Sequence, residues 1–379
     1  MTNPSTLYCA TDKEIFDILI SSKQRITELI MLELARTRGI FYSPKDTREI
    51  LANSLSLLLH DYYDINTILD HREQAGRGEK FSSVILNTPI SIEDIREISI
   101  DYRDQVSSDE TVIPQQQGAN KFVLNIKYSE FDYSRTSLVQ RRHKEANIEF
   151  IIEKDRTVIR MPANDKASEV VQDLKNRLDA KKKTEISTNL VELTEFPDPK
   201  TRIEFFTSLI SKLPEFQLVT VTSVKVESSF KESNENELDL EDDQDTEQAQ
   251  QEMLTLVKKV ALKGQNLMSS PEYQQLTKKG FYITYLIWCS KQLNRPYHKV
   301  EFEAGFQEPE TGKGFRYNVR GAYHYVQKQE YTKHRKSLSN DEKQPFLSLI
   351  EQTAHKTIAD LRQKEEMHPV TESTGRGKS

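Results

Sequence analysis

The residues whose side-chain types most clearly suggest a chemical role lie between Lys313 and Lys336. These 24 residues contain five aromatic residues and one acidic residue, Glu330. The cations are Lys313, Arg316, Arg320, Lys328, Lys333, Arg335 and Lys336, and the histidines are His324 and His334. Lysine and arginine attract phosphates and release their counterions, and aromatic rings stack on bases. The composition therefore predicts a nucleic-acid-binding surface that includes Arg316 and Arg320.

If this segment forms a β-hairpin with the strand before it, some of these arginines would pair with glutamates of that strand. If Phe306 faces Phe315 across two antiparallel strands, Glu301 lies opposite Arg320, and Glu303 lies near Arg316. Cross-strand pairs of opposite charge stabilise a sheet by about 0.2 to 1 kcal/mol. The cluster left unpaired is then Lys328, Lys333, His334, Arg335 and Lys336. Because basic runs are often only solvated surface, an ordinary loop stays an open alternative for this cluster.

A second basic run, Arg141-Arg142-His143-Lys144, lies in the middle of the chain. Arg141, Arg142 and Lys144 are candidate phosphate contacts by the same argument. A solvated surface is again the alternative.

No pattern in the sequence specifies a reaction. Metal-dependent nucleases need clustered carboxylates, and Glu130, Asp132, Glu149 and Glu153 supply candidates within residues 122–161. A carboxylate-x-lysine triplet like that of such enzymes appears at Asp198-Pro199-Lys200. Proline in a central strand removes a ladder hydrogen bond, so this triplet suits a helix cap instead. We therefore expect no catalytic residue, metal or cofactor, with a metal-dependent nuclease as the alternative.

A short segment resembles a known DNA-associated module. Leu34 to Leu55 combines Arg38-Gly39-Ile40 and Ser43 with a predicted helix on each side. This pattern is similar to the two-helix SAP module. Pro44 and Asp46 stand where that module commonly has glycine and lysine. The resemblance implies two packed helices and contact with DNA.

An acidic segment organises the charge of the chain. Residues 232–257 contain ten carboxylates and no lysine or arginine, whereas 21 lysines and arginines face 13 acids from Lys258 onward. Like charges repel and bury little apolar surface, which favours a solvated linker. We therefore predict five parts. They are a helical domain (1–80), an α/β domain (81–231), an acidic linker (232–247), a basic α+β domain (248–367) and a disordered tail (368–379).

Hydrophobic periodicity predicts an α+β fold for these parts. Helical spacing dominates residues 11 to 80, and a period of two begins at Phe122. Helices are predicted at 165–178 and from Asp198-Pro199 onward. The basic domain should contain a three-stranded sheet, from strands at 281–289, 300–306 and 315–325, and a terminal helix that begins at Ser339.

The composition limits the cellular locations in which this protein is expected. The 379 residues are 36% hydrophobic and 30% charged, and no apolar run approaches the roughly 20 residues that span a bilayer. Two distant cysteines give no disulfide framework, which fits a reducing compartment. We expect a cytoplasmic protein without membrane contact.

These features together favour a non-catalytic subunit that binds nucleic acid or another partner. The expected setting is a multi-component prokaryotic system for DNA defence, including antiviral defence, or DNA maintenance. A protein partner or a homo-oligomer is expected. A scaffold subunit that binds only protein is the remaining alternative.

Overall fold

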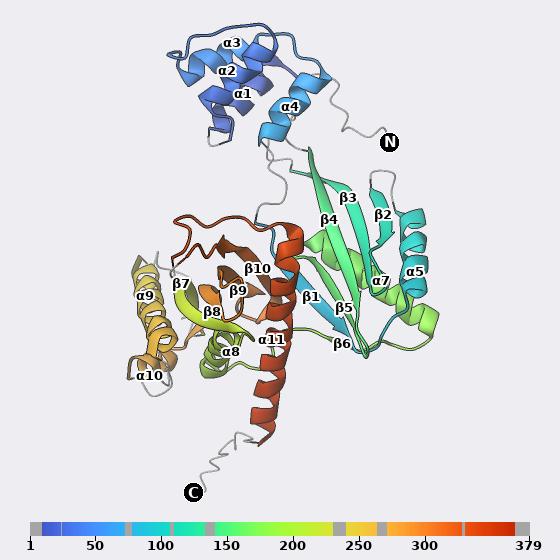
Figure 1. Ribbon diagram of the computed structural model, residues 1–379, viewed down its shortest axis with the longest axis vertical. Coiled ribbons are helices and arrows are strands. Elements are labelled where there is room, and N and C mark those ends of the chain that lie inside the picture. The colour runs from blue at the N-terminus through green and yellow to red at the C-terminus, as the bar shows by residue number, and fades with distance from the viewer. Residues whose placement is uncertain are drawn as a thin grey trace, which may run out of the picture. The chain divides into compact units, whose positions relative to one another are not determined.

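The computed structural model describes residues 10–23, 25–72, 78–106, 110–132, 141–229, 240–263, 271–327 and 330–367. These residues form an α+β protein with ten helices and one ten-stranded, mostly antiparallel sheet (Figure 1). The chain divides into two compact units. The first takes its described residues from Met1–Arg77, Ser99–Gln115 and Leu124–Asn147, and the second takes the others. Among the described residues, no helix is both long enough and apolar enough to cross a membrane.

Four helices open the first unit and confirm the predicted helical segment. They are α1 (Asp12–Ser21), α2 (Glu28–Thr37), α3 (Arg48–Ser56) and α4 (Tyr62–Arg72). Threonine caps the first three, because its hydroxyl accepts a hydrogen bond from a backbone N–H of the first turn that has no helical partner. Apolar residues at helical spacing form a core of their own, which includes Ile15, Leu19, Met31, Leu51 and Leu55.

The two helices of the SAP-like segment are α2 and α3. Gly39 follows α2 with φ at +74°, a conformation that residues with a Cβ rarely adopt. Glycine therefore ends this helix. The contact with DNA that the resemblance implies stays a prediction.

The remaining elements build the sheet and the helices around it. The strands are β1 (Phe81–Leu86), β2 (Thr111–Gln116), β3 (Lys121–Phe131), β4 (Arg141–Ile152), β5 (Thr157–Pro162), β6 (Thr188–Asn189), β7 (Phe216–Ser228), β8 (Phe281–Gln292), β9 (Lys299–Glu308) and β10 (Lys313–Tyr323). The helices are α5 (Ile92–Gln105), α7 (Asp165–Lys182), α8 (Pro199–Ser211), α9 (Leu240–Lys263), α10 (Pro271–Lys278) and α11 (Asn340–Met367). The strand order is β2-β3-β4-β5-β1-β10-β9-β8-β7, and β6 pairs with β1.

The order of elements along the chain repeats. A strand, a helix, four strands and a helix occur as β1, α5, β2 to β5 and α7, and again as β6, α8, β7 to β10 and α11. The second copy differs by carrying α9 and α10 between β7 and β8. The four-strand runs lie at opposite ends of the strand order, with β2 and β7 at the two edges.

The prediction of three separate domains is wrong. β7 pairs with β8 from Phe216 opposite Gln292 to Ser228 opposite Phe281, across the acidic segment. β1 pairs with β10 where Phe81 faces Tyr317. The segment is thus an insertion within a hairpin, and the predicted three-stranded sheet is part of the larger one. Charge runs reveal which segments prefer water, but they do not reveal which strands pair. Residues 232–239 lie outside the described part of the chain, and α9 begins inside the predicted linker.

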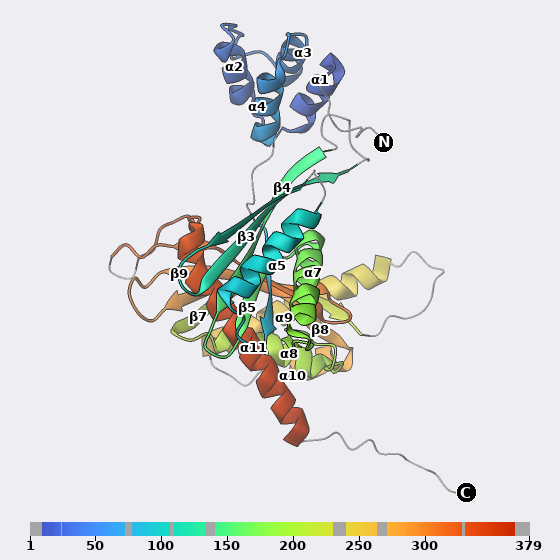
Figure 2. The ribbon, with the colours of Figure 1, turned by 90° about the vertical axis from the view of Figure 1, so that its right-hand side faces the viewer.

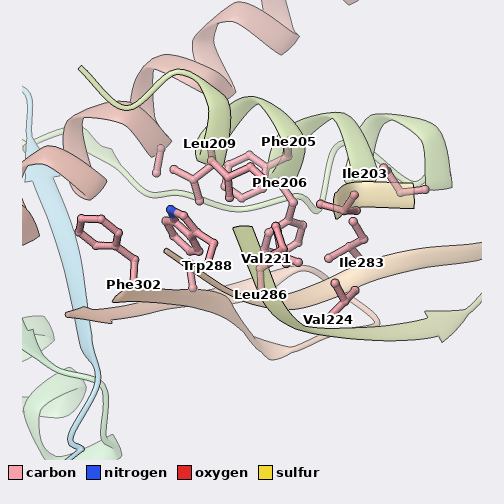
Figure 3. Packing of buried hydrophobic residues seen from close by; sticks show 14 of the residues in the cluster. Ile203, Phe205, Phe206, Leu209, Val221, Val224, Ile283, Leu286, Trp288 and Phe302 are labelled. Carbon is pink, nitrogen blue, oxygen red and sulfur yellow. The ribbon is translucent and has the colours of Figure 1, made fainter. Parts of the chain in front are cut away.

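Apolar side chains of α8 fill the space above β7 and β8 (Figure 3). Asp198 accepts a hydrogen bond from the Lys200 backbone, and Pro199 occupies the first turn, so this helix begins as predicted. Phe205 and Phe206 of α8 pack over the strands, and Trp288 of β8 stacks on Phe302 of β9 at 5.5 Å between ring centroids.

The last helix, α11, is long and connects several parts of the second unit. Its start is the predicted capping box, in which the Ser339 and Glu342 side chains exchange bonds with each other's backbone N–H. The helix packs against α8 and β10. In Figure 2, β5 lies between the ribbons of α7 and α11. All six residues of β5 are buried.

Candidate functional site

The predicted arginines of β10 lie on a polar face of the sheet. Along this strand Phe315, Tyr317 and Val319 are buried in the apolar core, while Arg316 and Arg320 alternate with them. Successive side chains of a strand point to opposite faces, so the arginines point away from this core. We use the name basic sheet face for the side chains of Lys80, Lys225, Tyr285, Glu301, Glu303, Arg316, Asn318, Arg320 and Arg335.

The predicted hairpin register is confirmed. Phe315 faces Phe306, and the Arg320 Nε atom lies 3.5 Å from a carboxylate oxygen of Glu301. A bulge between Val319 and Gly321 shifts the register by one residue, so that Gly321 is the residue directly opposite Glu301.

Glu303 has partners that the sequence argument did not identify. It accepts hydrogen bonds from the Tyr285 hydroxyl and, at 3.1 Å, from the Asn318 amide. Asn318 is the residue opposite it on β10, and Arg316 faces Gly305 instead.

Glu301 also binds Arg335, which arrives from a loop. We call residues 324–338 the strap; its described residues are 324–327 and 330–338. Arg335 forms an ion pair with Glu301. The Ala322 and Lys336 backbones exchange two hydrogen bonds, of 2.9 and 3.0 Å. A Cβ at Gly321 would lie 2.4 Å from the Lys336 carbonyl oxygen, so glycine permits this close approach.

Tyr285 lies at the centre of the basic sheet face. Gly305 stands beside it, where a Cβ would come within 2.7 Å of the tyrosine ring. The Lys80 ammonium lies 4.4 Å from the ring centroid, and that of Lys225 lies 5.9 Å from it. Burial and the bond to Glu303 raise the pKa of the Tyr285 hydroxyl, so it stays protonated and donates. The ring attracts both ammonium groups to its electron-rich face.

Lys80 is half-buried among other cations. It immediately precedes β1, and its carbonyl accepts a hydrogen bond from the Ala163 backbone at 2.8 Å. Burial lowers the pKa of the Lys80 ammonium. The charges of Arg316, Lys225 and Arg320 act in the same direction, and only Glu303 opposes them.

The face carries more positive charge than its own carboxylates neutralise. Its cations are Lys80, Lys225, Arg316, Arg320 and Arg335, and its carboxylates are Glu301 and Glu303. The Arg316 Nε atom is buried and has no hydrogen-bond partner among the described residues. The excess of positive charge on this face favours a bound anion, because an external negative charge would offset the repulsion among the cations.

The other predicted residues have different surroundings. Lys333, His334 and Lys336 are exposed on the strap, and no carboxylate of the described chain forms an ion pair with either lysine. Lys328 and the side chain of Arg141 lie outside the described residues. Arg142 and Lys144 lie on β4 in the first unit, where Lys144 pairs with Glu130 at 2.7 Å.

Three of the four carboxylates considered for a nuclease, Glu130, Glu149 and Glu153, form ion pairs with cations. Glu149 lies 3.0 Å from the Lys121 ammonium and 3.2 Å from the Arg160 guanidinium. Glu153 pairs with Arg156 at 2.5 Å. Within the described ranges, no group of three or more histidine, cysteine or acidic side chains is arranged to hold a metal ion.

Sequence reasoning missed Lys80, Lys225 and Tyr285. Lys225 lies in the run of residues 218–226, which is rich in β-branched side chains, so its place on a strand was accessible to a periodicity argument. The sequence around Lys80 does not indicate that it belongs to the site. Only the pairing of β1 with β10, more than two hundred residues away, brings Lys80 to this surface.

Comparison with protein-family models finds none that matches this chain, and comparison with curated proteins finds no matching relative.

Proposed function

We propose that this chain is a non-catalytic nucleic-acid-binding protein that holds the phosphate backbone on its basic sheet face. The observation that carries the proposal is the convergence of five cations around two carboxylates that already have partners. Phosphates of a polyanion would supply the missing negative charge.

The side-chain chemistry favours phosphate as the group that is bound. An arginine presents five N–H donors in a planar fork that matches phosphate oxygens. Arg320 and Arg335 contact the same carboxylate oxygen of Glu301, so each keeps donors available for a second acceptor. The exposed Lys333 and Lys336 of the strap extend the charge beyond the sheet, as a chain of phosphates requires.

The charge excess favours a nucleic acid over an isolated phosphate. Each phosphate contact made by a lysine or arginine releases condensed counterions, and this release supplies most of the non-specific affinity for nucleic acid. The cations come from β7, β10, the strap and the residue before β1, so a ligand with several phosphates can use them together.

Substitution of Arg316 tests the proposal. Arg316→Gln should weaken binding to a fluorescent DNA or RNA oligonucleotide, measured by anisotropy. The slope of log K against log salt should also become less steep by about one unit, as expected for the loss of one phosphate contact.

The matched control is Arg177→Gln. Arg177 lies on α7 and pairs with Asp173 at 2.7 Å, and it does not belong to the basic sheet face. This variant removes the same charge and should bind as the unaltered protein does. Equal losses of affinity in the two variants, or no loss in either, would contradict binding through the basic sheet face.

A further inference from the structure

Lys80 has the surroundings of a nucleophilic amine. Its ammonium is half-buried and lies over the Tyr285 ring; the charges of Arg316, Lys225 and Arg320 favour the uncharged amine, and the charge of Glu303 opposes them. Lysines are activated as nucleophiles when they are desolvated or placed next to other cations, because both effects favour the uncharged amine. Lys80 combines the two effects, and the lowered pKa of its ammonium agrees with them.

The same cations provide a place for an anionic reagent. Arg316 and Arg320 lie on the same face of β10 with Asn318 between them, and their guanidinium groups can present N–H donors to a phosphate. A phosphate bound by these arginines would lie next to the Lys80 amine. Holding two reactants together in this way raises their effective concentration greatly.

We propose that Lys80 is a modification site that takes an acyl group from an acyl phosphate. The lone pair of the uncharged amine attacks the carbonyl carbon, a C–N bond forms and the C–O bond to the phosphate breaks. The released phosphate leaves with the electron pair of that bond and takes the proton that the nitrogen loses. The products are an amide at Lys80 and inorganic phosphate, with no oxidation or reduction.

The modification would regulate the basic sheet face. An amide carries no charge, so acylation removes one of the five cations and the attraction of Lys80 to the tyrosine ring. This consequence rests on the proposed nucleic-acid binding, whereas the acylation itself does not.

A second buried lysine, Lys343, distinguishes the effect of the anion site on lysine reactivity from the effect of burial alone. Burial also lowers the pKa of Lys343, in the first turn of α11, but no neighbouring cation contributes to that shift. Lys343 therefore shares the desolvation of Lys80 without its arginines. If burial alone controlled reactivity, the two lysines would react alike.

The experiment treats the full chain with acetyl phosphate and measures the acetylation of each lysine over time by peptide mass spectrometry. Lys80 should react faster than Lys343 by at least about tenfold, a modest advantage for pre-positioned reactants. A neutral acetylating ester, which has no phosphate to bind, should reduce this preference. Arg316→Gln should slow the reaction of Lys80 with acetyl phosphate more than its reaction with the ester, because the ester reaction loses only the effect of the Arg316 charge on the amine, whereas the acetyl phosphate reaction also loses a phosphate contact.

Equal rates at Lys80 and Lys343 with acetyl phosphate would overturn the proposal, as would an Arg316→Gln variant in which Lys80 reacts undiminished. Nucleic-acid binding is measured separately, on Lys80→Gln as a mimic of the amide and Lys80→Arg as the charged control. Selective acetylation without any nucleic-acid binding would leave the modification site standing and remove the proposed function.

Discussion

Two buried carboxylates determine how much charge the basic sheet face can offer. Glu301 and Glu303 are each 7% exposed. A buried carboxylate is costly unless cations or hydrogen-bond donors surround it, and both residues meet that condition with different partners. Glu301 orients two guanidinium groups, and Glu303 orients the tyrosine that attracts the two lysines. The carboxylates thus arrange the cations and leave a net positive charge.

His355 is a buried titratable residue away from this face. It lines a cavity of about 30 Å³ together with Glu351, Ser348 and Arg156, and it is 9% exposed. Neither ring nitrogen has a hydrogen-bond partner among the described residues. Burial, followed by repulsion from Arg156 and Arg362, lowers the pKa of His355 to about 4. The folded protein therefore holds this imidazole uncharged at neutral pH.

The pH dependence of stability should reveal His355. Because its pKa is lower in the folded state than in the unfolded state, the unfolded state binds the proton more readily. The contribution to stability is complete above about pH 6.5 and is lost as the pH falls toward 4. Between pH 7 and pH 5 this loss should be about 2 kcal/mol. Urea unfolding measures it in the unaltered protein and in His355→Leu.

The His355→Leu variant should lose less stability over that range than the unaltered protein does. Asp94 titrates far below it, because bonds from Lys181 and Lys182 lower the pKa of that carboxyl. Identical pH profiles for the two proteins would show that His355 is not buried in its uncharged form.

At the scale of elements, a buried arginine attaches α11 to the sheet. Arg160 of β5 is fully buried and pairs with Glu351 of α11 and with Glu149 of β4. Its guanidinium also donates to Gln344 and Ser348, and the Tyr317 hydroxyl donates to Glu351. Burial alone would lower the pKa of Arg160, but the bonds and charge of Glu351 outweigh it and raise that pKa.

Removal of this arginine should destabilise the protein strongly. Arg160→Met leaves the Glu351 carboxylate buried without its cation, which typically costs about 3–5 kcal/mol. Arg177→Met, which breaks a partly exposed pair within α7, should cost no more than about 1 kcal/mol. Urea unfolding at pH 7 compares the two variants. A difference of less than about 1 kcal/mol between them would contradict the importance given to the buried network.

The sequence predicted elements whose signals are local. Ser339 marked the start of the terminal helix, and Phe306 with Phe315 fixed a hairpin register. It did not predict that β1 joins β10, because such pairing depends on packing between segments far apart in sequence. The residues of the basic sheet face also fall into those that a local sequence pattern predicted and those that only the fold revealed. Arg316, Arg320 and Arg335 came from composition, while Lys80 required the completed sheet.

At the scale of the whole molecule, the acidic segment interrupts a hairpin. The four-strand runs β2 to β5 and β7 to β10 occupy opposite ends of the strand order, and only the second run carries α9 and α10 between its first two strands. α9 packs against β7, and α10 packs against β8. The chain on both sides of the segment therefore contributes to one apolar core.

Cutting the chain in this segment should not separate its two parts. A protease site placed between residues 234 and 235 and then cleaved should give two fragments that co-elute in gel filtration, because β7 stays paired with β8. The fragments should separate in denaturant. Separate elution under native conditions would favour the independent domains that the charge pattern alone predicts.

The measurement that tests the central proposal most directly is a salt titration of nucleic-acid binding by the full chain. Single- and double-stranded DNA and RNA are each titrated from low to physiological salt. If the basic sheet face binds phosphates, log K should fall with log salt with a slope of about −3 or steeper for the preferred duplex or strand, as expected for several phosphate contacts. A slope near zero for every nucleic acid would contradict the account, because phosphates would then not be the ligand.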